Sequence, residues 1–221
     1  MGSWMASVRG ARFSARGPAL FALLALLALG LVACGGSAST GGSDEGSSGG
    51  GDGAAAAEDS FTAAYPTALE AMQAVAEDCM PLGAGTGGLA LADVPSNWSF
   101  TFYSPGKNML YIVDVEHGAA GEPREFIEAP KGTEITKSID PATIEVGAAQ
   151  AVAMAREFGS QSGTLPKNVL VAGSFAQTPQ SADAGTDIGV WEVTFASGTD
   201  LADAQAFTVD MMTGEVAAAK E

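Results

Sequence analysis

The sequence predicts an α+β fold built from two degenerate repeats, each a helix packed on an antiparallel β-sheet. Two observations carry this prediction. A segment with helical spacing of apolar residues precedes a set of strand-like segments twice along the chain. The strand-like segment 98–102 also matches segment 191–195, with tryptophan first and phenylalanine last in both. Because neither a helix nor a sheet with one apolar side can bury that side alone, we expect each helix to cover the sheet of its own unit.

The 221 residues divide into four predicted segments. They are a lipoprotein signal peptide over residues 1–33, a lipidated cysteine with a flexible linker over 34–57, a first αβ unit over 58–135 and a second over 136–221. The linker consists almost entirely of glycine, serine, alanine and acidic residues. Such a composition cannot bury enough apolar area to fold, so the linker is predicted to be a spacer.

The N-terminus has the order of a secretory signal, with a basic region ending at Arg16 and an apolar core from Ala19 to Leu31. The apolar stretch of about 15 residues is shorter than the roughly 20 that a membrane span needs. The run from Leu31 through Ala33 to Cys34 resembles the lipobox of bacterial lipoproteins. This resemblance implies cleavage before Cys34, lipidation of its thiol and a lipid anchor on the extracytoplasmic face of the cell membrane.

The first unit opens with a predicted helix that has Pro66 in its first turn, where proline is tolerated. The apolar residues on one side of this helix are Leu69, Met72, Val75, Ala76 and Cys79. Pro81 and the glycines from 83 to 88 are expected to end it. Cys79 is therefore predicted to be a core-facing residue at the helix end and not a nucleophile.

Strands are expected after this helix at the short apolar run 89–91, then at 98–102, 110–115 and 124–128, with turns at 104–108 and 118–121. Trp98 shares one side of its strand with the two phenylalanines that follow. Tyr103 falls out of phase with them and is predicted to be exposed.

The second unit repeats this order. Asp140 is predicted to cap a helix with Pro141 at its first position, and the helix ends near Gly159. The apolar residues on one side of this helix are Ile144, Ala148, Ala151, Val152 and Ala155. Strands are expected at 169–175, 190–195 and 206–211, with a polar loop over 197–205 between the last two.

The two units also match beyond the tryptophan strands, which correspond at an offset of 93. Segment 111–114 matches 207–210 at an offset of 96, and Gly118 falls on Gly214 at that same offset. We attribute the difference to a hairpin loop that is three residues longer in the second unit.

The segment 209–216, Val-Asp-Met-Met-Thr-Gly-Glu-Val, resembles the turn that ends the last strand of PepSY domains. Gly214 can adopt the positive φ that a tight turn requires, and Asp210 and Thr213 can hydrogen-bond free backbone groups. In the first unit His117 stands where Thr213 stands in the second. The resemblance implies a helix on an antiparallel sheet, and an extracytoplasmic binding or inhibitory module that often acts on peptidases.

The charge excludes one class of partner. The net charge is −16, and three of the 10 basic residues precede Cys34 whereas all 26 acidic residues follow it, so the mature chain carries 7 − 26 = −19. Such a surface repels polyanions, so we exclude nucleic acid as a partner.

Few residues have the chemistry of an active site. His117 is the single histidine, so neither a histidine-based triad nor a multi-histidine metal site is expected. Asp114, Glu116 and His117 could bind a metal weakly, but a solvated strand edge is the preferred interpretation. Trp98 and Trp191 are expected to fill the space beneath the helices; the alternative is an exposed pair that forms a binding face.

We therefore expect no catalytic residue, no cofactor and no metal, and we expect that the protein is not an enzyme. The predicted function is a non-enzymatic binding or inhibitory module, tethered to the membrane by the lipid on Cys34, that modulates a peptidase or another envelope component. A protein or peptide of the cell envelope is the expected partner. The alternative is an accessory subunit or a weak carboxylate-based hydrolase of the envelope, which needs two acids converging in a pocket.

Overall fold

A computed structural model of the chain describes residues 60–219, with gaps at 87–96, 132, 184–186 and 198–202. The predicted signal peptide, the lipidation site Cys34, the linker and the expected strand at 89–91 lie outside the described residues. No helix in the described part of the chain is long and apolar enough to span a membrane.

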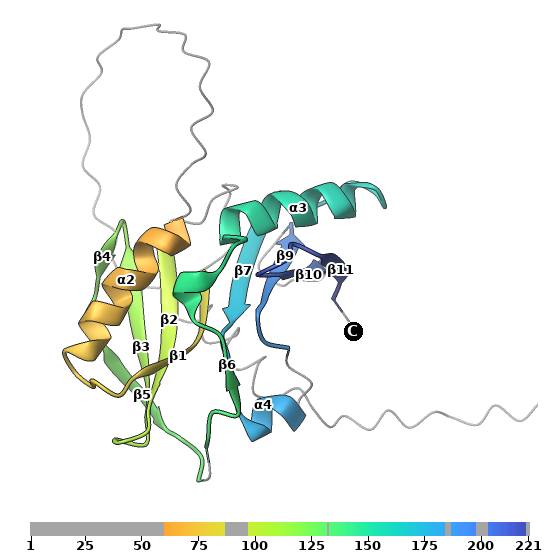
Figure 1. The fold of residues 1–221 in the computed structure, drawn as a ribbon. Coiled ribbons are helices and arrows are strands. Elements are labelled where there is room, and N and C mark those ends of the chain that lie inside the picture. The colour runs from red at the N-terminus through yellow and green to blue at the C-terminus, as the bar shows by residue number, and fades with distance from the viewer. Residues whose placement is uncertain (1–59, 87–96, 132, 184–186, 198–202, 220–221) are drawn as a thin grey trace, which may run out of the picture. The chain divides into compact units, whose positions relative to one another are not determined.

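The fold is α+β, as predicted, and is organised around a nine-stranded sheet in which every pair of neighbours is antiparallel (Figure 1). The order across the sheet is β11-β10-β9-β7-β1-β2-β3-β4, and β5 pairs with β3 beside β4. The strands are β1 Met80–Thr86, β2 Asn97–Ser104, β3 Met109–Glu116, β4 Ala119–Ala120, β5 Arg124–Glu128, β7 Asn168–Ser174, β9 Val190–Ala196, β10 Gln205–Asp210 and β11 Val216–Ala218.

In the described part of the chain, two helices of more than two turns cover the sheet. Helix α2, Ser60–Gln73, contacts β2, β3 and β4, and α3, Ala148–Ser160, contacts β7, β9, β10 and β11 (Figure 1). The smaller elements are the 3₁₀ helix η1 Pro141–Thr143, the strand pair β6 Lys137–Ser138 and β8 Ala176–Gln177, and the short helix α4 Pro179–Asp183. The sheet therefore has one half under α2 and the other under α3.

An aromatic cluster joins these two halves in one core. The ring of Phe61, from α2, lies 5.3 Å from the ring of Trp98 and 4.9 Å from that of Trp191. The two tryptophan rings are 6.0 Å apart, and both are at most 1% exposed. Their prediction as filling residues beneath the helices is confirmed, and the alternative of an exposed aromatic pair is wrong.

The first helix begins at Ser60, earlier than predicted, so Pro66 lies inside α2 and not in its first turn. The buried stripe of α2 explains this start, because Phe61, Ala64, Tyr65 and Ala68 follow one another at helical spacing. The helix also ends earlier, at Gln73, which leaves Val75 39% exposed.

The segment expected to end that helix is a strand. β1 contains Gly83 and Gly85, which had been interpreted as helix breakers, and Cys79 lies just before β1 and not at a helix end. A Cβ atom on Gly83 would lie 2.8 Å from the carbonyl oxygen of Gly173 on β7. Glycine therefore allows β1 and β7 to approach, and this contact joins the two halves of the sheet.

Six of the predicted strands are confirmed as β2, β3, β5, β7, β9 and β10, within one or two residues at each end. The turn expected at 118–121 contains the short strand β4. Asp140 caps η1 and not the long helix, which begins at Ala148 after an extended segment that contains Ile144. The other four residues of the predicted apolar side are buried: Ala148, Ala151, Val152 and Ala155.

Strand pairing corrects the expected offset of the third strand. Trp98 lies opposite Val115 and Trp191 lies opposite Val209, so these partners correspond at 209 − 115 = 94 and not at 96. A shift of two residues leaves every side chain on the same face of a strand. The hydrophobic pattern therefore could not distinguish the two offsets.

Candidate functional site

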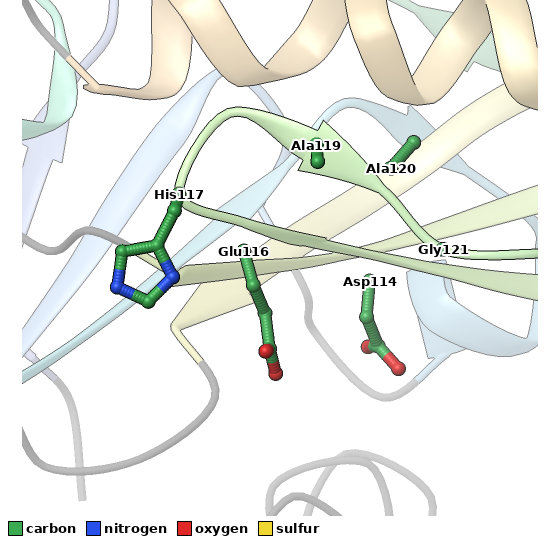
Figure 2. A pocket seen from close by; sticks show the side chains of 6 residues that line it. All are labelled: Asp114, Glu116, His117, Ala119, Ala120 and Gly121. Atoms are coloured by element: carbon green, nitrogen blue, oxygen red, sulfur yellow. The ribbon is translucent and has the colours of Figure 1, made fainter.

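The acidic corner considered as a weak metal site lies where β3 turns into β4 (Figure 2). Asp114 and Glu116 point to the same side of the strand, away from α2, as alternation predicts. His117 and Gly118 form the turn, with φ values of 53° and 80°. Together with residues 119–121 these side chains line an open, shallow hollow.

Asp114 is already engaged within the protein. Its carboxylate accepts a hydrogen bond from the Ser99 hydroxyl on β2 and forms an ion pair of 2.5 Å with Arg124 on β5. These contacts link three strands across the sheet. Among the residues that the structure describes, no three of the side chains that commonly bind metals are grouped so that they could hold an ion. The contacts of Asp114 form a network at the edge of the strands.

Cys79 is half-buried and packs against the core, as expected of an unreactive thiol. Burial raises its pKa, and the neighbouring carboxylate of Asp78 raises it further. A higher pKa lowers the thiolate fraction at neutral pH, so the site is poorly suited to nucleophilic chemistry.

The turn at Asp210 has the structure that the sequence predicted. Asp210 accepts hydrogen bonds from the Thr213 amide at 2.7 Å, the Met212 amide at 2.9 Å and the Thr213 hydroxyl at 3.0 Å. The Thr213 amide contributes most to holding the pKa of Asp210 below its usual value. Gly214 has a φ of 74°. These contacts stabilise a turn, and the carboxylate of Asp210 is engaged by the hydrogen bonds within it.

We call the face of the sheet opposite α2 and α3 the open face. It carries the strand positions that alternate with the buried ones. Thr194 on this face is 8% exposed. The exposed or half-exposed residues near its centre are Gly85, Ser99, Thr101, Ile112, Leu170, Ala172, Glu192 and Thr208. Small and hydroxyl-bearing side chains predominate, so a partner could approach the strands closely.

Tyr103 was expected to be exposed on this side but is 5% exposed. Its hydroxyl lies 3.3 Å from the carbonyl oxygen of Thr133, which it donates to, and 3.5 Å from the Asn108 side chain. The segment after β5 therefore covers this end of the open face. The prediction was wrong because alternation assigns a side of the strand but not what packs on it.

No protein-family model, curated protein or solved structure matches the chain.

The sequence does not predict the centre of the open face, because Pro81 and the glycines of β1 indicate the end of a helix and not a strand. Gly85 and Ala172 lie opposite each other where β1 pairs with β7. The signal that could have located this pair is the alternation along 169–172, in which valine is buried at every second position.

Proposed function

We propose that this protein is a lipid-tethered extracytoplasmic module that binds, and by binding inhibits or positions, a peptidase or another protein of the cell envelope. We further propose that its folded part consists of two degenerate PepSY-like units. The observation that carries the proposal is the open face, because neither α2 nor α3 covers this side of the sheet and a protein partner can dock on its strand residues.

The arrangement of the tryptophans supports the repeat. In each half a helix precedes three antiparallel strands, and the tryptophan lies on the middle one. Trp98 donates its indole N–H to the hydroxyl of Ser60, the first residue of α2, at 3.1 Å. Trp191 donates to the carbonyl of Val146, two residues before α3, at 2.7 Å. Both indoles thus bond to the beginning of the helix that covers them.

The junction of the sheet supports the repeat as well. Thr86 lies opposite Trp98 and Gly173 opposite Trp191, which sets an offset of 173 − 86 = 87 between β1 and β7. At that offset Gly85 corresponds to Ala172, and these two residues pair with each other. Equivalent residues pair with each other in this way when the two halves are related by a local two-fold axis between β1 and β7.

The chemistry of the described residues supports binding over catalysis. A carboxylate-based hydrolase needs two acids that converge with separated pKa values. In the corner of Figure 2, Asp114 is ion-paired with Arg124, while Glu116 lies exposed at the end of β3. The resemblance to a lipobox at Cys34 supports the tether. The predicted linker, residues 34–57, would keep the folded part near the membrane.

The open face is tested by placing an arginine on it. Envelope proteins are cross-linked in living cells to the full-length lipidated protein, to Ala172→Arg and to Ala153→Arg, and the captured partners are quantified by mass spectrometry. Ala172 is exposed on the open face, and Ala153 is exposed on α3, so the second variant is a matched control. We expect Ala172→Arg alone to lose the partner. Equal capture by all three proteins would contradict the open face as the site.

The tether is tested separately. Cys34→Ser should abolish lipidation and leave the chain uncleaved or released to the medium, as measured by mass spectrometry of membrane and medium fractions. An unmodified Cys34 in membrane-bound wild-type protein would refute the lipid anchor, whatever the result on the open face.

A further inference from the structure

The two edges of the sheet differ in how well they are protected. The outer edge strand β5 has a bulge opposite Leu110 and Tyr111 and carries charged Arg124, Glu125 and Glu128 among its five residues. Bulges and charges are the features that keep an edge strand from pairing with another chain. The other edge strand, β11, is short, has no bulge and consists of Val-Ala-Ala. Its shortness limits pairing, but it has neither a bulge nor a charged residue.

The backbone of β11 has hydrogen-bonding groups that point outward. Glu215 accepts from the amide of Asp210 on β10, and the amide of Ala219 donates to Ala206. Since the bonding direction alternates along an antiparallel strand, Val216 and Ala218 direct their N–H and C=O groups away from β10. In the described part of the chain β11 is the last strand on this side.

An exposed aromatic side chain of α3 packs on β10, the strand beside this edge. Phe158, on α3, is 39% exposed, and its ring is 6.0 Å from that of Phe207 in an edge-to-face arrangement. Phe207 is the cross-strand partner of Ala218. A strand added to β11 would therefore have alternate side chains beside Phe158. Val216 packs against the core, so the exposed Glu215 directly before it lies by alternation on the other side of the sheet.

We infer that β11 and Phe158 form a docking site for an extended peptide segment in which apolar and basic residues alternate. The apolar residues contact Phe158 on the side of the sheet that carries α3, the basic residues face Glu215 on the other side, and the backbone pairs with Val216 and Ala218. A second copy of this chain is disfavoured as the occupant, because self-pairing of β11 would bring like charges together on a protein of net charge −16. The inference deepens the proposed binding function but uses a surface other than the open face.

The probe is a dye-labelled heptapeptide of alternating lysine and valine, and its binding to the full-length protein in a zwitterionic detergent is measured by fluorescence anisotropy. Two control peptides separate the contributions. N-methylation of alternate amides removes backbone pairing while keeping the charge, and glutamate in place of lysine reverses the charge. We expect each control peptide to bind at least about tenfold more weakly, a difference of roughly 1.4 kcal/mol.

Variants of the protein locate the site. Ala218→Pro removes an outward amide without taking a hydrogen bond from β10, and Phe158→Ala removes the aromatic contact. Each should weaken binding by about tenfold. Val75→Ala is the control, because Val75 is also 39% exposed but lies beyond the end of α2, and its affinity should stay within about twofold. Thermal unfolding of every variant verifies that it folds.

Hydrogen exchange gives an independent measurement in which the peptide should protect the amides of Val216 and Ala218. Equal binding of the N-methylated peptide, protection elsewhere, or no binding would overturn the inference. So would self-association of the wild type that Ala218→Pro abolishes, because the occupant would then be a second copy. If the peptide fails while Ala172→Arg still loses the envelope partner, only this inference falls.

Discussion

The halves of the sheet under α2 and α3 share an order of elements but hold their tryptophans by different chemistry. Trp98 bonds to the Ser60 hydroxyl, which can rotate to another partner, whereas Trp191 bonds to the buried main-chain carbonyl of Val146. The strand beside Trp98 has Thr86 opposite the indole, and the strand beside Trp191 has Gly173. The two halves therefore share the order of helix and strands although different residues hold the two tryptophans.

Gly173 leaves space for the Trp191 ring, whereas the ring of Trp98 leaves room for the side chain of Thr86. A Cβ atom on Gly173 would lie 2.5 Å from the ring of Trp191 and 2.9 Å from the Met211 methyl carbon. Thr86 instead accepts a hydrogen bond from the Val171 amide at 3.2 Å. The second half is thus packed more tightly around its indole, and four predictions measure this difference.

The largest expected effect is the loss of either indole. Trp98→Ala and Trp191→Ala should each lower the free energy of unfolding by about 3–5 kcal/mol, because each empties a fully buried site. Trp191→Ala should cost more, since it leaves the buried Val146 carbonyl without its donor. Urea denaturation followed by circular dichroism measures both. If Trp98→Ala were the more destabilising variant, the contrast between the halves would be wrong.

The next effect concerns the junction of the halves. Gly173→Ala should cost about 1–3 kcal/mol because the added methyl group overlaps Trp191. Gly85→Ala is the matched control on the neighbouring strand, where the added Cβ would lie 3.6 Å from the nearest atom, the Val171 carbonyl oxygen. That change should stay within about 0.5 kcal/mol. Denaturation midpoints decide the outcome, and equal costs would contradict the tighter packing.

A third effect is confined to the first half, which contains all three tyrosines. Burial, and then the carboxylate of Asp140 and the thiol of Cys79, raise the pKa of Tyr65 from its usual value of 10.0 to about 12. The unfolded chain therefore loses this proton first as pH rises. The contribution of Tyr65 to the free energy of unfolding is therefore fully present below pH 10 and is lost between pH 10 and about 12.

Thermal unfolding at several alkaline pH values, compared with Tyr65→Phe, isolates this contribution. The variant should lose less stability than the wild type over the same interval. A tyrosine absorbance titration that finds no group ionising late in the native protein would count against the assigned pKa.

The smallest effect is at the turns that follow the third strand of each half. His117 and Gly118 both have positive φ in the first half, whereas in the second only Gly214 does. Asparagine followed by glycine suits a two-residue turn of this kind better than histidine does. His117→Asn should stabilise the protein by about 0.5 kcal/mol or less, as measured by differential scanning calorimetry. A lower melting temperature would show that the histidine has a role beyond the turn.

Most strands were predictable because their side chains alternate between a buried and an exposed face. Trp98, Phe100 and Phe102 are all buried, and the strand that carries them extends only one or two residues beyond the predicted ends. The strand β1 was not predictable, since its glycines serve a contact with β7 that lies about 90 residues away in sequence. The open face was missed for the same reason, because its centre is this contact.

The sequence by itself determined the α+β class, the place of both tryptophans in the core and the role of Asp210 and Gly214 in their turn, because these follow from local periodicity and backbone preference. Tertiary structure decided how the two halves meet, where the helices begin and which end of the open face is covered by another segment. Pairing of β1 with β7, burial of Phe61 between the two indoles and coverage of Tyr103 depend on segments distant in the chain. Local patterns show which side of a helix or strand is apolar, and only the packing of the whole chain determines which segment contacts that side.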